Sequence, residues 1–281
     1  MLLAADVGNT DIVLGAFDGP NLHQIWRVDS TTRRTADELA VLVDRFLATE
    51  GYAGISAVSE IVVGSVVPSA TRTLRMMAER RKIPLVEVRG DANLGLTMDV
   101  DNPAEVGPDR IANALAALER FAPPLLVVDF GTATTFTYID ASGAFAGGVI
   151  APGVTTALSA LASRAARLGG VEVAAPPKAV GRNTVHAMQS GLYYGWGALV
   201  DGMVARIEAE KGEELPVIAT GGLAVILADV CERIDQVVPT LTLEGLRIAR
   251  DRIRHAARSA PSVAKGKGAK VKVAARAGKK R

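Results

Sequence analysis

Two short stretches of the sequence each place a carboxylate, a glycine and a hydroxyl directly after an apolar run. Residues 6–10 read DVGNT, and residues 129–134 read DFGTAT. A glycine lets the backbone approach an anion closely, and successive amide N–H groups in a tight turn bind anions. A carboxylate beside such a turn repels phosphate unless a cation lies between them, and Mg²⁺ prefers one or two carboxylates together with phosphate oxygens and water. The stretches therefore predict binding of a polyphosphate with a metal ion.

Other phosphate-binding motifs are absent from the chain. There is no Gly-x-x-x-x-Gly-Lys-Ser/Thr sequence, and Lys82 is the only lysine between Met1 and Pro177, so the phosphate-binding region has no P-loop lysine. The letters DFG at 129–131 match the metal motif of protein kinases, but the Val-Ala-Ile-Lys and His-Arg-Asp elements are missing. No Gly-x-Gly-x-x-Gly follows a predicted strand, which disfavours a nicotinamide enzyme.

One acidic glycine turn alone is usually an ordinary hairpin. Here the turn occurs twice, with Asp6 and Gly8 matched by Asp129 and Gly131 123 residues later, and each opens a predicted three-stranded meander. An internal repeat of domain size explains this register. A third glycine turn, Ala219 to Gly222, follows a later strand and is where a nucleotide base or ribose can approach the backbone.

The rest of the pattern alternates helices and strands. We expect the meander strands before Asp6, at 12–17 and 24–28, and again at 125–128, 136–139 and 145–150. Further strands are predicted at 60–66, 84–88 and 217–219, and helices after the Thr35/Glu38 capping box and at 70–81, 153–168, 183–209, 223–231 and 241–258. The sequence predicts an α/β fold of two similar halves, 1–121 and 122–258, with a hinge near 121–124 and a ligand cleft between them.

Composition narrows the functional class. The net charge of +2 includes eight Lys and Arg and no acid in 259–281, so the body is acidic and the end is expected to be a disordered basic tail. An acidic body disfavours nucleic-acid binding. The longest uncharged window, 141–163, is interrupted by Gly, Pro and Thr, so no membrane segment is expected. One cysteine and three histidines disfavour a Cys/His metal cage and fit a cytoplasmic location.

The chain resembles type III pantothenate kinases, which belong to the acetate and sugar kinase/Hsp70/actin superfamily. The resemblance covers roughly residues 1–250 and rests on six motifs in order. These are DVGNT at 6–10, NPxEVGPDR at 102–110, DFGTAT at 129–134, GGxIxPG at 147–153, NT at 183–184 and ATGG at 219–222. It implies a duplicated ribonuclease H-like (actin-like ATPase) fold.

The resemblance also implies an activity: phosphorylation of pantothenate by ATP to 4′-phosphopantothenate, the first step of coenzyme A biosynthesis, by a homodimer that needs Mg²⁺ and a monovalent cation, K⁺ or NH₄⁺. By resemblance, Asp109 is the proton acceptor, Asp129 holds the monovalent cation, and Asp6 meets Mg²⁺ through the phosphates. The implied ATP contacts are Asp6, Val7, Gly8, Asn9, Thr10, Asp11, Ile12, Val13 and Thr132. The implied pantothenate contacts are Val100, Gly107, Pro108, Asp109, Arg110 and Thr184.

Simpler structural roles remain open for several of these residues. Asp109 also fits a carboxylate that stabilises the N-terminus of a helix, and Arg110 also fits an exposed salt-bridge arginine. Cys231 is most simply a small buried hydrophobe. Glycines in the 183–209 helix indicate close packing, either within one subunit or at a dimer interface that brings Thr184 to a partner's site. Two other functions stay open: a nucleotide-binding regulator without turnover, and a kinase of another small hydroxyl substrate.

Overall fold

The computed structural model describes residues 1–92, 94–164 and 171–259, which form two five-stranded sheets with helices on both sides. The first sheet has the order β3-β2-β1-β4-β5. Its first three strands form an antiparallel meander, and β4 and β5 then add in parallel to β1. The strands are β1 (Leu2–Val7), β2 (Asp11–Asp18), β3 (Asn21–Asp29), β4 (Glu60–Ser65) and β5 (Leu85–Glu87).

The second sheet repeats this topology, with the order β10-β9-β6-β7-β8. Again the first three strands are an antiparallel meander and the last two add in parallel. The strands are β6 (Leu125–Phe130), β7 (Ala133–Ile139), β8 (Phe145–Pro152), β9 (Val217–Thr220) and β10 (Gln236–Val237). The predicted α/β fold of two duplicated halves is confirmed.

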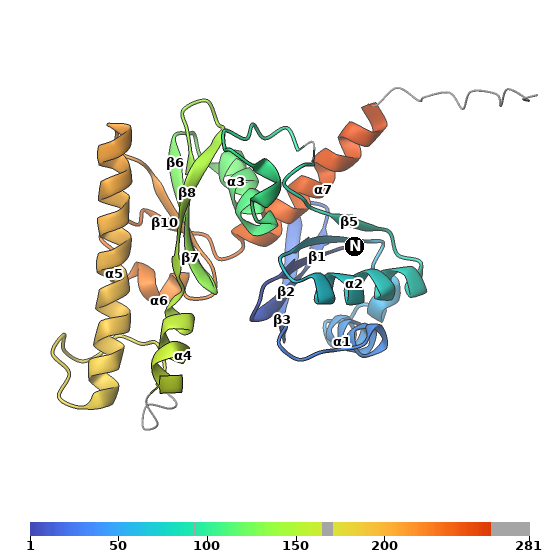
Figure 1. Ribbon diagram of the computed structural model, residues 1–281. Coiled ribbons are helices and arrows are strands. Elements are labelled where there is room, and N and C mark those ends of the chain that lie inside the picture. The colour runs from blue at the N-terminus through green and yellow to red at the C-terminus, as the bar shows by residue number, and fades with distance from the viewer. Residues whose placement is uncertain (93, 165–170, 260–281) are drawn as a thin grey trace, which may run out of the picture.

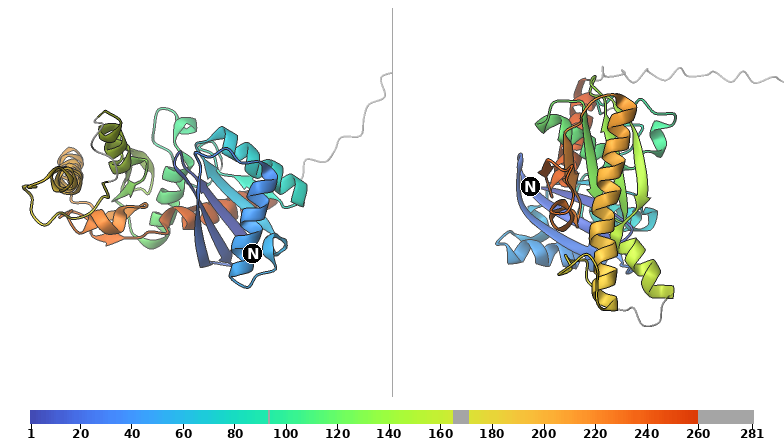
Figure 2. Two further views of the ribbon diagram at one scale, coloured as in Figure 1. Left: turned by 90° about the horizontal axis from the view of Figure 1, so that it is seen from below. Right: turned by 90° about the vertical axis from the view of Figure 1, so that its left-hand side faces the viewer.

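Helices form three layers around the two sheets. Helices α1 (Ala36–Thr49) and α2 (Pro68–Arg81) cover the outer face of the first sheet, while α4 (Val154–Arg164), α5 (Thr184–Lys211) and α6 (Ala224–Ala228) lie on the far side of the second. Helices α3 (Pro108–Arg120) and α7 (Leu241–Ser259) lie between the sheets (Figures 1 and 2). Two short 3₁₀ helices, Gly54–Ala57 and Pro103–Glu105, complete the described elements.

Strand alternation decides which residues face the central layer. In β1, Leu2 and Ala4 pack with α3 and α7, whereas Leu3, Ala5 and Val7 pack with α1 and α2. In β6, Leu125 and Val127 face the same central layer, and Leu126 and Val128 face α5. Successive strand residues point to opposite faces, so the next residue that faces the central layer is Asp6 in β1 and Asp129 in β6. The alternation thus turns both acidic turns toward one layer.

Helix α7 follows the second half in the chain but packs on the first sheet. A β-carbon built on Gly245 would lie 1.8 Å from Ala112 O, so this glycine permits the close approach of α7 to α3. Leu246 lies against Gly64 of β4, and Glu60 at the start of β4 forms ion pairs with Arg250 and Arg254.

Most predicted elements are present, with differences at their ends. The capping box is confirmed, because Thr35 Oγ1 accepts from Glu38 N and Glu38 Oε2 accepts from Thr35 N. The helix predicted at 223–231 is only five residues long, since the chain leaves it in turns that end at Cys231. The strand β10 was not predicted, because its two residues are too short to show alternation. The end of the helix predicted at 153–168 and the basic tail from 260 lie outside the described residues.

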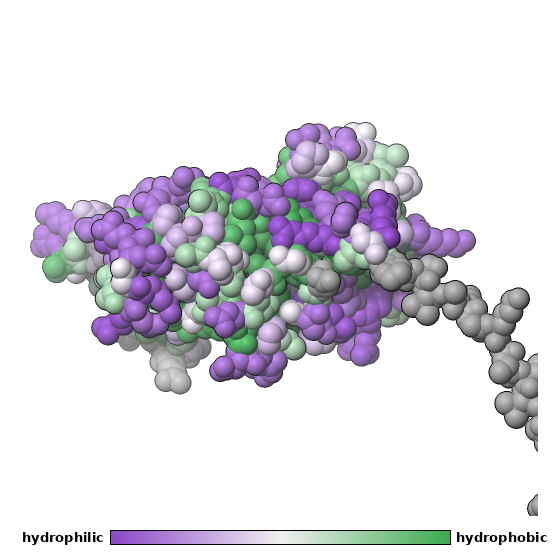
Figure 3. Space-filling view, turned by 90° about the horizontal axis from the view of Figure 1, so that it is seen from above, coloured by the Kyte–Doolittle hydropathy of each residue, from purple (hydrophilic) through white to green (hydrophobic). Residues whose placement is uncertain are grey.

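Other expectations concern single residues and the surface. Cys231 is 8% exposed, and burial raises its pKa to about 12, so the interpretation as a buried hydrophobe is confirmed. Within the described residues, no helix combines the length and apolarity needed to cross a bilayer. The face in Figure 3 is largely hydrophilic, with smaller hydrophobic areas toward its middle.

Candidate active site at the junction of the two halves

The two glycine turns meet where the halves face each other. Each turn is closed by its glycine amide: Gly8 N donates to Asp11 O at 2.9 Å, and Gly131 N donates to Ala133 O at 3.1 Å. The side-chain oxygens of Thr10 and Thr132 are 3.1 Å apart. We call the region around these turns and the first turn of α3 the junction site. It brings the predicted phosphate-binding turns of both halves together.

Three carboxylates converge on the junction site, from β1, β6 and α3. Burial and the charges of Asp109 and Asp129 raise the pKa of Asp6 to about 8, while the charge of Arg27 acts in the opposite direction. Burial and the charge of Asp109 raise the pKa of Asp129 to about 6. Both residues keep some accessible surface, yet their carboxyl groups lie deep enough for desolvation to be the largest cause. The site thus disfavours the charged forms of Asp6 and Asp129.

Asp109 lies in the first turn of α3, where the motif Gly107-Pro108 sets its position. Pro108 is the first helical residue and packs against Gly64 of β4, which pairs with Asp6. A β-carbon on Gly107 would lie 2.3 Å from Asp109 Oδ1, so the glycine leaves room for the carboxylate. Asp109 is therefore a helix N-terminal carboxylate and a junction residue at once, and these two interpretations are compatible.

Arg110 points the other way, onto the second sheet. Its guanidinium carbon lies 5.1 Å from the centre of the Phe145 ring, and Nε donates to Thr137 Oγ1 at 3.4 Å. Burial lowers its pKa, against the opposing effect of Asp109. A β-carbon on Gly148 would lie 2.7 Å from Arg110 Nη2, so this glycine of the GGxIxPG motif makes room for the arginine. Arg110 is half-buried rather than an exposed salt-bridge residue.

The segment that leads to Val100 runs beside the same phenylalanine. Phe145 N donates to Thr97 O, and Asp99 N donates to Phe145 O, both at 2.9 Å. Val100 itself is half-buried and packs on the central core. The structure thus brings the residues before Val100 next to the surface on which Arg110 lies.

The glycine turn of 219–222 closes the junction site from the second half. Gly221 has φ +95°, and a β-carbon there would lie 2.5 Å from Asp129 Oδ1. Only glycine fits this backbone beside this carboxylate. Gly153, in the GGxIxPG motif, lies equally close to Thr132: its amide donates to Thr132 O at 3.1 Å.

The other residues implied as ATP contacts differ in what they expose. Val7 and Ile12 are 1% and 5% exposed and pack in the outer core of the first half, so only their backbone can meet a ligand. Gly8, Asp11 and Val13 are half-buried, and Asn9 is exposed at the turn.

Thr184 is not at the junction site. It is the first residue of α5, is exposed, and lines an apolar groove of about 420 Å³ between α4 and α5. Residues of both helices line this groove: Ala157, Leu161, Thr184, Ala187, Met188, Gly191, Leu192 and Trp196. Thr184 of one chain therefore does not complete the site of the same chain.

Two functional candidates had no sequence motif. Asn113, 1% exposed on α3, donates from Nδ2 to Asp129 Oδ2 at 2.8 Å, and Arg27 on β3 lies across from Gly222. For Asn113 a signal was present: it is the one polar residue in the buried stretch Ile111 to Ala117. Arg27 stands in an ordinary edge strand and had no such signal.

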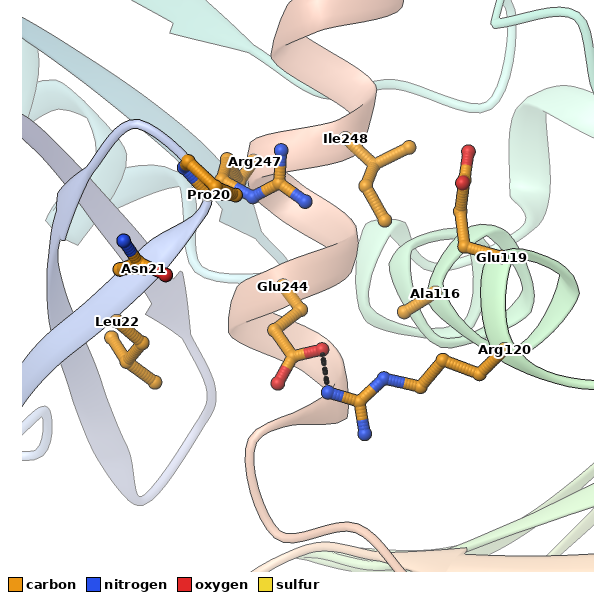
Figure 4. Close-up of a pocket in the computed structure, with 9 residues that line it drawn as sticks. All are labelled: Pro20, Asn21, Leu22, Ala116, Glu119, Arg120, Glu244, Arg247 and Ile248. Atoms are coloured by element: carbon orange, nitrogen blue, oxygen red, sulfur yellow. Dashed lines mark hydrogen bonds and ion pairs between the residues drawn. The ribbon is translucent and has the colours of Figure 1, made fainter.

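A second hollow, of about 360 Å³, lies outside the junction site between the β2–β3 turn, α3 and α7 (Figure 4). Arg120 and Glu244 point toward each other across it and form an ion pair of 2.5 Å. The turn that lines it, with Pro20, is at the opposite end of β2 from Asp11. Paired charges and this location separate the hollow from the phosphate turns.

A cation fits the junction site only with help from a ligand. Among the described residues, no three His, Cys, Asp or Glu side chains are grouped as a metal-binding set. Single carboxylates with raised pKa values, such as Asp6 and Asp129, instead suit ions whose remaining ligands are phosphate oxygens and water. The residues present therefore fit cations such as Mg²⁺ whose other ligands are phosphate oxygens and water.

Two ribonuclease H-like halves that present matching acidic turns to each other define the class: this is the actin-like ATPase fold. A solved structure agrees, the activator of 2-hydroxyisocaproyl-CoA dehydratase from Clostridium difficile with bound ADPNP. It superposes with a TM-score of 0.53 at 12% identity, covering 92% of this chain and 97% of that one, which shows the fold alone.

Sequence comparison identifies the family within this class. A family model described as type III pantothenate kinase matches residues 2–206. The type III pantothenate kinase of Thermomicrobium roseum is 47% identical over 255 residues, covering 90% of this chain and 98% of that protein. That of Myxococcus xanthus is 47% identical over 249 residues, covering 88% and 97%. The chain belongs to the type III pantothenate kinase family, and the resemblance found in its motifs is confirmed.

Proposed function

We propose that the protein transfers the terminal phosphoryl group of ATP to pantothenate and so forms 4′-phosphopantothenate for coenzyme A biosynthesis. The observation that carries this is the meeting of two acidic glycine turns, joined at Thr10 and Thr132, in a member of the type III pantothenate kinase family. The turns offer amide donors to phosphates from both sides. Its relatives are matched over almost their whole length.

The three glycine turns bind the nucleotide. Gly8, Asn9, Thr10 and Asp11 hold the phosphates from the first half, Thr132 holds them from the second, and the Gly221 turn meets the nucleoside. Val7 and Ile12 contribute backbone groups only, since their side chains are buried. Asp6 and Asp129 balance the charge of Mg²⁺ and a monovalent cation, K⁺ or NH₄⁺, which neutralise the polyphosphate.

Pantothenate lies between the first turn of α3 and the Phe145 surface. Asp109 accepts the proton of the attacking hydroxyl, a role that needs a carboxylate within hydrogen-bond reach. Arg110 is held by Phe145 and Thr137 with part of its guanidinium free, and it binds the pantothenate carboxylate. Gly107 and Pro108 fix the approach of Asp109, and Val100 lines the apolar side of this pocket.

The active form is a homodimer built on α4 and α5. Thr184 lies outside the site of its own chain, and the groove it lines exposes Leu161 by 49%. Gly191, Gly195 and Gly202 have no described atom within 4 Å of a built β-carbon, so packing within one subunit does not explain them. A partner helix against this face would bring Thr184 to the partner's substrate.

The single cysteine, which allows no intrachain disulfide, suits a cytoplasmic enzyme, and the acidic body disfavours nucleic-acid binding.

The test of the proposed function is ADP release from ATP by the pure protein with Mg²⁺ and K⁺, with and without pantothenate. Pantothenate-dependent release with a product of the mass of phosphopantothenate supports the proposal. Nucleotide binding without turnover points to a regulator, and turnover only with another alcohol points to a different kinase.

A further inference from the structure

Arg27 lies in line with Asp6 across the first sheet. In the antiparallel pairing, Asp6 is opposite Val13, and Val13 is opposite Arg27. Residues directly opposite each other share a face of the sheet. Because Val13 packs against the central core, this row of three residues faces the junction site. Two strand spacings, about 10 Å, separate the backbones of Asp6 and Arg27.

The Arg27 side chain reaches the other half of the molecule. Its charge lowers the pKa of Asp6, against burial and two carboxylates. A β-carbon built on Gly222 would lie 3.7 Å from Arg27 Nη1 and 3.9 Å from Nη2. The guanidinium thus lies over the glycine turn of the second half.

Within the part of the chain that the structure describes, Arg27 also has no ion pair that explains its position. It is exposed, and none of the ion pairs among the described residues includes it. Nor does the repeated fold require an arginine there. The matching row of the second sheet is Asp129, Thr135 and Ile150, so the same position in the other half is an isoleucine.

The junction site needs such a cation. Asp6, Asp109 and Asp129 repel one another, and a bound polyphosphate adds further negative charge. Most phosphate-transfer sites hold a lysine or arginine at the phosphates. Here the only lysine between Met1 and Pro177 is Lys82, which caps the C-terminus of α2. Arg110 is held against the ring of Phe145 on the second sheet.

We propose that Arg27 binds the phosphates of the nucleotide across the junction, from β3 of the first half to the Gly221–Gly222 turn of the second, and neutralises charge that develops during phosphoryl transfer. It takes the role of the missing P-loop lysine from an edge strand. A forked guanidinium gives two parallel N–H donors to phosphate oxygens, which a lysine cannot do.

Binding measurements separate this role from a structural one. Titration calorimetry with the full chain compares ADP with adenosine for wild type, Arg27→Ala, Arg27→Lys and Arg45→Ala. Arg45, an exposed arginine of α1 remote from the junction, is the matched control. We expect Arg27→Ala to weaken ADP binding at least tenfold and leave adenosine binding unchanged, Arg27→Lys to recover part of the loss, and Arg45→Ala to match wild type. Equal weakening of ADP and adenosine would overturn the proposal.

Steady-state kinetics provide a second test of the role of Arg27, and this test rests on the proposed kinase activity. Arg27→Ala should lower kcat/KM for ATP by roughly 10²- to 10³-fold and change the KM for pantothenate less than threefold. A variant within threefold of wild type for ATP would overturn the role in transfer. If wild type itself has no pantothenate-dependent turnover, the proposed function fails while the ADP and adenosine titrations still decide the role of Arg27.

A double-mutant cycle excludes an indirect effect through Asp6. If Arg27 only screened Asp6, Arg27→Ala would cost nothing further in ADP affinity once Asp6 is asparagine. We expect the ADP loss to persist in the Asp6→Asn background. Its disappearance there would show that Arg27 acts on the carboxylate and not on the phosphates.

Discussion

Asn113 and Asp129 are joined by a 2.8 Å hydrogen bond from the buried face of α3 to the end of β6. The amide oxygen of Asn113 in turn accepts from Thr242 Oγ1 of α7, also at 2.8 Å. Both hydrogen-bond donors, Asn113 and Thr242, therefore come from helices of the central layer. The hydrogen bond from Asn113 lowers the pKa of Asp129, whereas burial raises it. The carboxylate therefore has one oxygen fixed by the protein and the other turned to the Gly221 side.

Asn113→Leu should weaken the response to the monovalent cation. Without the amide, Asp129 loses its orientation and its pKa rises, so we expect a several-fold higher K⁺ concentration for half-maximal activity. Loss of a buried hydrogen bond to a charged group should also destabilise the fold by about 1.5 to 3 kcal/mol. A second measurement does not depend on turnover. It compares the melting temperature of the ADP complex in KCl with that in choline chloride, and the increase in KCl should be smaller for Asn113→Leu than for wild type.

Thr242→Val is the graded comparison, since it removes only the outer bond of the chain and keeps the volume of the side chain. Its effect on the K⁺ response should be smaller than that of Asn113→Leu. Equal K⁺ responses in wild type and Asn113→Leu would contradict an orienting role.

Asp109→Asn should reduce turnover by roughly 10²- to 10⁴-fold and leave ATP affinity nearly unchanged, because the amide keeps the shape but cannot accept the proton. Arg110→Ala should instead raise the KM for pantothenate. Steady-state kinetics of both variants test the division of roles. If Asp109→Asn turns over within a few-fold of wild type, Asp109 serves only the helix N-terminus.

Asp6 gives a pH dependence of stability in the ligand-free protein. The unfolded chain loses this proton near pH 4, whereas the folded protein holds it up to about pH 8. Between these values the folded state binds more protons, so the free energy of unfolding decreases as pH rises. Asp6→Asn should raise the melting temperature at pH 8 by a few degrees and much less at pH 5. Asp18→Asn, at the exposed end of β2, should show no such difference; equal gains for Asp6→Asn at both pH values would refute the assignment.

Gly221→Ala tests the contact of the third glycine turn with Asp129. Gly212 provides the control, because it also has positive φ, +76°, but no described atom lies within 4 Å of its built β-carbon. Gly212→Ala should cost about 1 kcal/mol through the backbone alone. Gly221→Ala should lose more stability and most of its ADP affinity, measured by thermal unfolding and calorimetry. Similar behaviour of the two variants would mean that the contact is unimportant.

Met188→Glu places a charge in the groove between α4 and α5 and should dissociate the proposed dimer. We expect a monomer by light scattering, with reduced activity because Thr184 no longer reaches a partner. Val41→Glu is the control, an apolar residue that is 64% accessible on the outer helix α1, remote from the groove. A dimer that persists in Met188→Glu would place the interface elsewhere.

The sequence predicted those parts of the site that depend on local backbone. Gly8 and Gly131 mark tight turns after apolar runs, and their matched spacing reveals the repeat and hence the fold. Asn113 and Arg27 become functional only through contacts between elements: Asn113 of α3 meets Asp129 at the end of β6, and Arg27 meets Gly222 almost two hundred residues away in the chain. Local sequence patterns do not predict contacts between elements. The packing of α7 on the first sheet could not be predicted for the same reason, because the apolar face of a helix does not indicate which sheet it covers.

The chain passes between the halves twice, once from α3 into β6 and once from β10 back into α7. Two covalent links restrict the relative motion of the halves more than a single link would. A single proteolytic cut at either link leaves the halves attached through the other. Nicking at 121–124 should therefore lower the melting temperature of the protein before it separates the two halves.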